Sequence, residues 1–332
     1  MEQKKLKDDL SNGILGKLIL LFGEERFLVS HYAQSIENTA KSSQATPLYK
    51  DVFEGTIPKK EIIMAAETVP FLSEKRLIYV KDSKLFTSER KTEAEELAGY
   101  LPKIPDDTTI VFVEHDVDRR LRLYKKMVEH GLAVNCEPPT TSVLIKWIVR
   151  TMKEKGKPVT ESVANDLQRI CGTNMTTLFQ EMDKLAHYCL DKKNVTVQDI
   201  KAICTPTLEA RIFDLTKAMG AGRASDALTH YRNMLFLKES PFVILAMIIR
   251  QLRIILLCKC AEEKNIPRRQ IEKDLNIRDF VIREALSHGL RFTKAQLLSA
   301  LNNCQDTDLK IKTGRLAPEI GVEVLLAGLS IS

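Results

Sequence analysis

Residues 17–28 read KLILLFGEERFL, a short apolar run that breaks at Gly23 and leads into a segment of helical period. An apolar run of this length before a glycine is typical of a buried strand, and the segment that follows is typical of a helix packed on it. Strand, turn and helix in this order are the first unit of an α/β fold.

The same alternation continues to residue 137. Further strands are predicted at 48–55, 76–82, 108–115 and 132–137, and helices at 24–40, 59–69, 88–101 and 119–131. The run at 108–115, TTIVFVEH, is rich in β-branched residues without alternation, which is typical of a strand buried on both faces. Strands that alternate with helices predict a largely parallel sheet covered on both sides.

Two breaks divide the chain into three predicted domains. The first is Pro138-Pro139-Thr140-Thr141 and the second is Thr205-Pro206-Thr207. Almost every segment after the first break has helical period, with Thr160 and Thr196 as expected N-caps. The sequence therefore predicts an α/β domain over residues 1–139, a small helical domain over 140–206 and a larger helical domain over 207–332.

The composition is that of a folded protein. Hydrophobic residues make up 44% of the 332 residues and charged residues 28%, and the formal charge of +6 only weakly favours polyanionic partners. The N-terminus is charged where a signal peptide needs an apolar stretch. The most apolar run, Pro241–Leu257, contains Arg250 and Arg253, so it is predicted to be a buried helix rather than a membrane span. We expect a cytoplasmic protein.

The seven cysteines include no CxxC pair. Their odd number and apolar surroundings favour buried, reduced thiols. Cys258 and Cys260 form a CxC pair, but no second Cys or His pair completes a zinc set, so no metal is predicted.

The turn after the first strand decides whether the α/β domain can bind a nucleotide. A phosphate loop needs GxxxxGK[ST], in which backbone N–H groups and a lysine surround the anion. Here Glu24 and Glu25 follow Gly23, and both the second glycine and the lysine are missing. Glu114 follows an apolar strand, which alone is a weak signal of catalysis. Since HExxH and GxSxG are missing as well, no catalytic residue and no cofactor are predicted.

Two segments are candidates for binding. Residues 70–76 read PFLSEKR, which places Phe71 and Leu72 in a predicted loop before four polar residues. Such a pair either anchors a partner or caps the domain's own core. The basic segment 118–127 offers candidate DNA contacts, although a solvated helix face is the preferred interpretation; these residues are Arg119, Arg120, Arg122 and Lys125.

Seven blocks in order resemble the delta subunits of bacterial DNA polymerase III clamp loaders, over essentially the whole chain. They are LLFGEERFLV, AAETVPFLSEKRLIYVKD, TTIVFVEHDVDRRLRLYKKM, GTNMTTLFQEMDKLAHY, RIFDLTKAM, SPFVILAMIIRQLRIILLCK and DLKIKTG. The resemblance implies an AAA+-like domain that lacks a working ATP site, a helical lid and a helical collar. It therefore implies a non-hydrolysing subunit of the polymerase III holoenzyme.

The resemblance also implies partners and site residues. The apolar pair that binds the beta sliding clamp and opens one ring interface falls on Phe71 and Leu72, or on Pro70 and Phe71 if the register differs by one. The collar joins the gamma/tau and delta prime subunits, and primed DNA is reached indirectly. Expected collar contacts are Arg250, Gln251, Arg253, Asp308 and Lys312.

Two other interpretations stay open at this point. One is an active AAA+ ATPase with an unrecognised nucleotide pocket, which tight Mg-ATP binding would indicate. The other is a stand-alone basic DNA-binding protein, which steeply salt-dependent DNA binding without any clamp would indicate.

Overall fold

The structure, a computed structural model, describes residues 2–42, 48–69 and 73–329. Its internal contacts divide the chain into two compact units, Met1–Pro138 and Pro139–Ser332, which we call the sheet unit and the helical unit. Each is described by itself. The further division of the helical unit near residue 206 stays a prediction.

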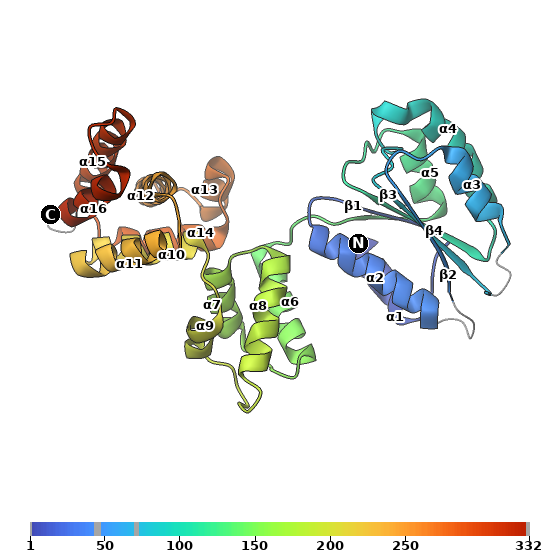
Figure 1. Cartoon of the computed structure of the whole chain (residues 1–332), viewed down its shortest axis with the longest axis horizontal. Coiled ribbons are helices and arrows are strands. Elements are labelled where there is room, and N and C mark those ends of the chain that lie inside the picture. Colours follow the sequence, from blue (N-terminus) through green and yellow to red (C-terminus); the bar gives the residue numbers. More distant parts are fainter. Residues whose placement is uncertain (1, 43–47, 70–72, 330–332) are drawn as a thin grey trace. The chain divides into compact units, whose positions relative to one another are not determined.

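The sheet unit is built on five parallel strands in the order β2-β3-β4-β1-β5 (Figure 1). All five predicted strands are confirmed. Every residue of β1 and β4 is buried, in keeping with the apolar sequence of β1 and the apolar run at residues 110–113 of β4, whereas β2 lies at the edge and is partly exposed. The strands are β1 (Leu18–Phe22), β2 (Tyr49–Glu54), β3 (Arg76–Lys81), β4 (Thr108–Glu114) and β5 (Leu132–Asn135).

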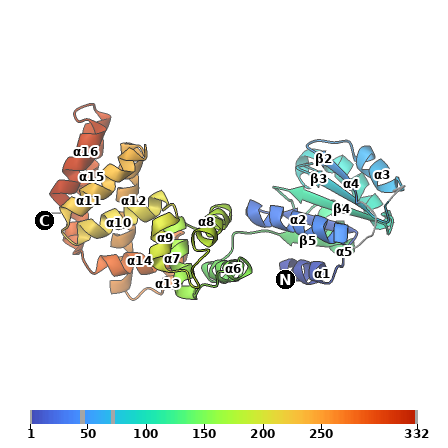
Figure 2. The ribbon, with the colours of Figure 1, turned by 60° about the horizontal axis from the view of Figure 1, so that its bottom comes forward.

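Helices cover both faces of this sheet (Figures 1 and 2). Because side chains alternate along a strand, Leu20 and Phe112 enter one core while Leu21 and Val111 enter the other. The first core is covered by α3 (Lys59–Glu67), α4 (Lys91–Tyr100) and α5 (Arg122–His130), and the second by α1 (Glu2–Ser11) and α2 (Arg26–Ser42). The short helices η1 (Ser88–Arg90) and η2 (Leu101–Lys103) flank α4.

Helix α1 was not predicted from the sequence. Its sequence, EQKKLKDDLS, has a negative mean hydropathy and a single fully buried residue, Leu6. Leu6 packs into the core under α2, and the Gln3 side chain donates a hydrogen bond of 2.7 Å to the carbonyl of Asn135 at the end of β5. Tertiary contacts rather than periodicity therefore place this helix.

The helical unit contains only helices among its described residues, so the fold class predicted from the sequence, α/β followed by all-α, is confirmed. Thr160 accepts a hydrogen bond from the N–H of Val163, and Thr196 forms a reciprocal capping box with Asp199, both as predicted. The helices are α6 (Thr141–Glu154), α7 (Glu161–Cys171), α8 (Met175–Tyr188), α9 (Val197–Ile203), α10 (Leu208–Gly220), α11 (Ala224–Phe236), α12 (Pro241–Glu263), α13 (Arg268–Leu275), α14 (Asp279–Gly289), α15 (Lys294–Lys312) and α16 (Pro318–Leu329).

Helix α12 is the central element of the larger helical core. Among the described residues it is the one helix long and apolar enough to cross a membrane by length and composition alone. Its side chains Ile248, Leu252 and Ile255 are fully buried, and it packs against α10, α14, α15 and α16. This packing accounts for the apolar side chains on the inner face of the helix, as the sequence predicted, whereas Phe242, Val243 and Leu257 of the same helix are exposed.

The cysteines are free thiols, and all but Cys260 are buried. Burial raises the pKa of Cys136 and Cys304 to about 12 and that of Cys258 to about 11. These thiols therefore keep their protons and behave as small apolar core residues.

Candidate functional site

The turn between β1 and α2 packs against the chain that follows β5. The N–H of Glu25 donates to the carbonyl of Cys136 at 2.9 Å, and the N–H of Cys136 donates to the carbonyl of Phe22 at 2.6 Å. The N–H groups of Arg26 and Phe27 bond to the Glu24 carbonyl and the Glu25 carboxylate. A phosphate loop needs such N–H groups free to converge on an anion, and here they already have acceptors.

Gly23 is needed in this turn for a steric reason. Its φ is +119°, and a Cβ atom built on it would lie 2.6 Å from the carbonyl oxygen of Cys136. Only glycine tolerates both the backbone angle and the close approach. The glycine that the sequence places at the start of a would-be phosphate loop therefore serves backbone packing.

Glu114, the acidic residue at the end of β4, is buried in a structural role. Its carboxylate accepts hydrogen bonds from the N–H and hydroxyl of Ser83 and from the N–H of Lys84. Burial raises the pKa of Glu114, which these hydrogen bonds partly oppose. Because Asp82 and Lys84 on either side of Ser83 have positive φ angles, the carboxylate holds a strained turn after β3.

We expect Glu114→Ala to lower the free energy of unfolding by about 2 kcal/mol, because the buried N–H and hydroxyl of Ser83 lose their acceptor. Urea denaturation of the whole chain measures this loss. Asp116→Ala is the control, since the Asp116 side chain lies two residues further along and is 84% exposed. Equal stability of the two variants would contradict the structural role of Glu114.

The predicted clamp-binding residues Pro70, Phe71 and Leu72 lie outside the described residues, but both ends of their loop are described. The guanidinium of Arg76 donates to the carbonyl of Thr68 at 2.7 Å and forms an ion pair with Asp51 at 2.6 Å. It also lies over the ring of Tyr49, 4.6 Å from its centroid. Since Arg76 is only 5% exposed, this cluster fixes where the loop leaves and rejoins the sheet unit.

The surface beside this loop is apolar. Met64 on α3 is 68% exposed and Val69 is 78% exposed, and Tyr49 on the edge strand is 46% exposed. They are three of the six large apolar side chains that the described part of the sheet unit exposes. A cluster of exposed apolar side chains around a firmly anchored loop is typical of a partner-binding surface. We call Tyr49, Met64 and Val69 the loop-flanking surface.

Three of the four candidate DNA contacts, all but Arg119, line one cavity of the sheet unit. Arg119 lies over the ring of Phe22, and Arg120 pairs with Asp118, whose pKa this contact lowers to about 2. Arg122 and Lys125 are exposed on α5 and line a shallow cavity with Arg120. DNA binding by these four residues stays a prediction.

The candidate collar contacts fall in three places. Arg250 and Gln251 line a cavity in the helical unit, while Arg253 is exposed on the same helix, α12. Asp308 and Lys312 pair with each other along α15 at 2.7 Å. Their role in subunit contacts stays a prediction.

The turn between α11 and α12 exposes a group of apolar side chains that was not singled out in the sequence. Phe236 is 87% exposed, and Leu237, Phe242 and Val243 are each between 46% and 52% exposed. We call these four residues the α11–α12 patch. Their sequence signal is the segment LFLKESPFV (235–243), in which apolar pairs flank a polar turn. The sequence does not distinguish this signal from a helix, because each pair continues a predicted helix.

One group of described residues has the spacing of metal ligands, namely Cys171, Glu181 and Cys204, all of which are buried. The Glu181 carboxylate, however, accepts a hydrogen bond from the N–H of Thr205 at 3.1 Å and pairs with Lys184 at 2.7 Å. A hydrogen bond to Cys204, together with burial, raises the pKa of Cys171. A protonated thiol and an occupied carboxylate are poor metal ligands.

Comparison with known proteins identifies related sequences over most of the chain. The family model described as "DNA polymerase III, delta subunit" matches residues 19–137, and "DNA polymerase III delta subunit, C-terminal domain" matches residues 209–329. Together they cover more than half of the chain. The DNA polymerase III subunit delta of Bacillus subtilis is 25% identical over 325 residues, covering 96% of this chain and 94% of that protein.

Solved structures show the same relationship at the level of the fold. The Bacillus subtilis DNA clamp loader delta protein (YqeN) matches with a TM-score of 0.66 and 24% identity, over 99% of each chain. The RuvB Holliday junction branch migration motor of Thermotoga maritima matches with a TM-score of only 0.37 and 11% identity, over 87% of this chain and 85% of that one. From the two family models, which cover separate parts of one chain in order, it follows that this protein belongs to the DNA polymerase III delta subunit family.

Proposed function

We propose that this delta subunit binds the beta sliding clamp through the loop at residues 70–72 and opens one interface of the clamp ring. The observation that carries the proposal is the anchoring of this loop by buried Arg76 together with the exposed apolar residues beside it. An apolar loop whose two ends are held in place can insert into a hydrophobic pocket at a lower entropic cost. Phe71 belongs to both registers of the apolar pair and is its central residue.

Ring opening by this route needs only differential binding. If the loop fits the open-interface form of the clamp better than the closed ring, docking shifts the clamp toward the open form. The size of the shift equals the difference between the two binding free energies. Covalent chemistry has no part in this step.

Nucleotide hydrolysis would then belong to other subunits of the loader. The packed turn after β1 supports this division of labour, because its N–H groups have protein acceptors and Glu24 and Glu25 carry negative charge. A calorimetric titration with Mg-ATP tests it, and tight binding would favour an active ATPase instead. Steeply salt-dependent binding to DNA without the clamp would favour a stand-alone DNA-binding protein.

We further propose a three-domain arrangement, in which residues 207–332 form a collar that joins the gamma/tau and delta prime subunits in the cytoplasm. Primed DNA would be reached only through the assembled loader. The α11–α12 patch supports this proposal, since exposed aromatic and aliphatic side chains are enriched in subunit contacts.

We expect Phe236→Asp to weaken binding to the other loader subunits at least about tenfold, because a charge would replace a large apolar side chain at the contact. The thermal stability of the Phe236→Asp variant should stay unchanged, since Phe236 is 87% exposed. Surface plasmon resonance with immobilised gamma and delta prime subunits measures the binding. The control is Leu190→Asp, an apolar side chain of similar exposure, 68%, after α8. Equal effects of the two variants would exclude the α11–α12 patch from the collar contact.

The proposal for the loop is tested by calorimetric titration of the whole chain with the beta sliding clamp. A clamp labelled across one interface with two fluorophores tests the second step, because opening separates the pair. If the chain binds the clamp and the fluorescence does not change, docking of the loop stands but ring opening is excluded.

A further inference from the structure

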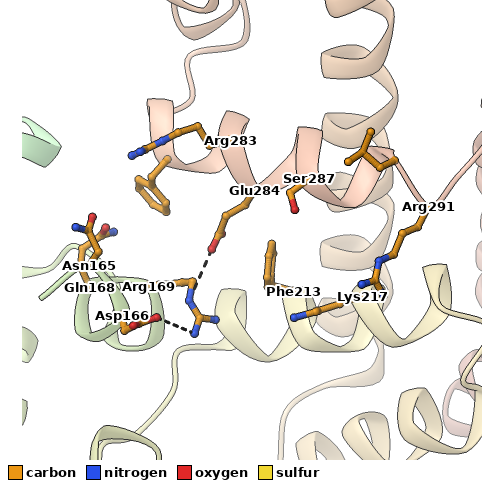
Figure 3. Close-up of a pocket in the computed structure, with 12 residues that line it drawn as sticks. Asn165, Asp166, Gln168, Arg169, Phe213, Lys217, Arg283, Glu284, Ser287 and Arg291 are labelled. Carbon is orange, nitrogen blue, oxygen red and sulfur yellow. Dashed lines mark hydrogen bonds and ion pairs between the residues drawn. The ribbon is translucent and has the colours of Figure 1, made fainter. Parts of the chain in front are cut away.

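A cavity of about 480 Å³ lies in the helical unit between α7, α10, α12 and the turn that joins α13 to α14. A second cavity, of about 700 Å³, adjoins it and shares part of its lining. The shared residues are Gln168, Arg169, Phe213, Phe280 and Glu284. Figure 3 shows the larger cavity, with Glu284 directed toward Arg169 and with Phe213 and Lys217 along its side. Volumes of this size are typical of small-molecule sites.

Two hydrogen-bond donors in the lining of the smaller cavity have no protein acceptor. Gln168 is only 2% exposed, and its Nε2 atom is buried and unpaired; the Nη1 atom of Arg278 is also buried and unpaired. Leaving a buried donor unpaired costs about 1–3 kcal/mol, so such atoms call for an acceptor. Because a guanidinium carries donors only, Arg278 can be satisfied only by an acceptor.

The charges around the two cavities favour an anion. Their linings contain six cationic and three acidic side chains. Arg169 is shared between Asp166 at 3.4 Å and Glu284 at 3.8 Å, which neutralises it. Lys217, Arg250 and Arg291 form no ion pair with any of the described residues and leave a surplus of positive charge. Their partner is therefore expected to be negatively charged.

The donors approach the smaller cavity from different elements. Gln168 lies on α7, Arg250 on α12 and Arg278 on the α13–α14 turn. A phosphate group presents oxygens in three directions, whereas a carboxylate presents two in one plane, so this arrangement suits phosphate better. The rings of Phe213 and Phe280 line both cavities and provide an apolar surface for a flat ring.

We propose that this cavity is a binding site for a small organic phosphate that carries an aromatic ring, of the size of a nucleoside monophosphate. The phosphate accepts hydrogen bonds from Arg250 and, once the side chains rotate to expose their buried donors, from Gln168 and Arg278, and the ring lies against Phe213 and Phe280. The site is separate from the turn at Gly23 and belongs wholly to the helical unit. It does not rest on clamp binding.

Binding of a phosphate at this site should also change the protonation of Glu284. The groups that face it are Arg169 on α7, Asp214 and Lys217 on α10 and Arg283 on its own helix, and burial raises its pKa to about 7. A bound phosphate repels the ionised carboxylate and so raises this pKa further. At pH 8, where free Glu284 is mostly ionised, binding should take up a proton. Calorimetry in two buffers with different ionisation enthalpies measures this uptake, and Glu284→Gln should abolish it.

The primary experiment is calorimetric titration of the whole chain with deoxyadenosine monophosphate. Inorganic phosphate and deoxyadenosine serve as probes for each half of the ligand. The monophosphate should bind at least about tenfold more tightly than either, because only it uses both the donors and the rings. Equal binding of inorganic phosphate, or no binding of the monophosphate, would overturn the proposal.

Two variants assign the binding to this cavity. Arg250→Gln and Gln168→Leu should each weaken monophosphate binding at least about fivefold, since each removes a donor to the phosphate. Arg253→Gln is the matched control, because Arg253 is an exposed arginine on the same helix, α12, that does not line the cavity. Arg250 is exposed as well, so its variant folds even if Gln168→Leu does not. Equal affinity of the Arg250 and Arg253 variants would place the anion elsewhere.

Discussion

Replacing Phe71 and Leu72 together with alanine is expected to weaken binding to the beta sliding clamp at least about thirtyfold. An apolar anchor buried at the centre of an interface contributes about 2 kcal/mol or more, and that free energy corresponds to such a factor. The free energy of unfolding should stay within about 0.5 kcal/mol, as for surface positions in general. Isothermal titration calorimetry with the clamp measures the affinity, and urea denaturation measures the stability.

A matched control for the loop variant is Ile14→Ala. Ile14 is 56% exposed in the same unit and does not belong to the loop-flanking surface. The Ile14→Ala variant should bind the clamp with the same affinity as the unchanged chain. Unchanged affinity of the double variant would remove the loop from the clamp contact. A large loss of stability would instead mean that Phe71 and Leu72 belong to the core of the sheet unit.

Gly23→Ala is expected to destabilise the chain by about 3 kcal/mol, which is among the largest effects of a single methyl group. The new Cβ would lie 2.6 Å from the Cys136 carbonyl oxygen and 2.8 Å from the Asn135 side chain, and φ is +119°. The turn would have to move away from β5, breaking the hydrogen bonds between Phe22, Glu25 and Cys136. Urea denaturation of the whole chain measures this loss.

Gly55→Ala separates the two causes of that loss. Gly55 also has a positive φ, +80°, but a Cβ there would meet no atom within 4 Å. It should lose only about 1 kcal/mol, the cost of the backbone angle alone. If both variants lose the same amount, the close approach of the Cys136 backbone contributes nothing, and the steric account of the β1–α2 turn is wrong.

The fold could be predicted from the sequence because its central strands and several of its helix starts have clear local sequence patterns. Strands β1 and β4 are buried on both faces, so β1 is apolar throughout and β4 is apolar over residues 110–113, and both runs stand out from the helices around them. The caps at Thr160 and Thr196 mark helix starts by local hydrogen bonds that the sequence shows directly. Such features depend on neighbours in the chain rather than on the tertiary structure.

Features that arise only from tertiary contacts could not be predicted. Helix α1 is held by Leu6 and by the bond from Gln3 to Asn135, 132 residues away. Glu114 was recognised as an acidic residue after a strand, but its role depends on a turn at Ser83 that no local pattern indicates.

The binding surfaces were only partly predictable. The apolar pair Phe71 and Leu72 was noticed because it interrupts a polar loop, but the anchoring of that loop by Arg76 requires a partner from β2, Asp51. The cavity in the helical unit joins residues of α7, α10, α12 and α14, which together span more than 100 residues of the sequence. Unpaired donors such as Gln168 Nε2 become visible only once the helices have packed.

A fluorescent reporter can be attached to a single cysteine of this chain, because the other six are buried. Thiol reagents must reach the sulfur atom, which burial prevents at six of the cysteines, whereas Cys260 on α12 is the one cysteine that is partly exposed. A maleimide dye should therefore modify the unaltered protein at one position. Its fluorescence anisotropy would rise as the labelled chain tumbles more slowly inside a larger complex, so assembly could be followed without any engineered residue.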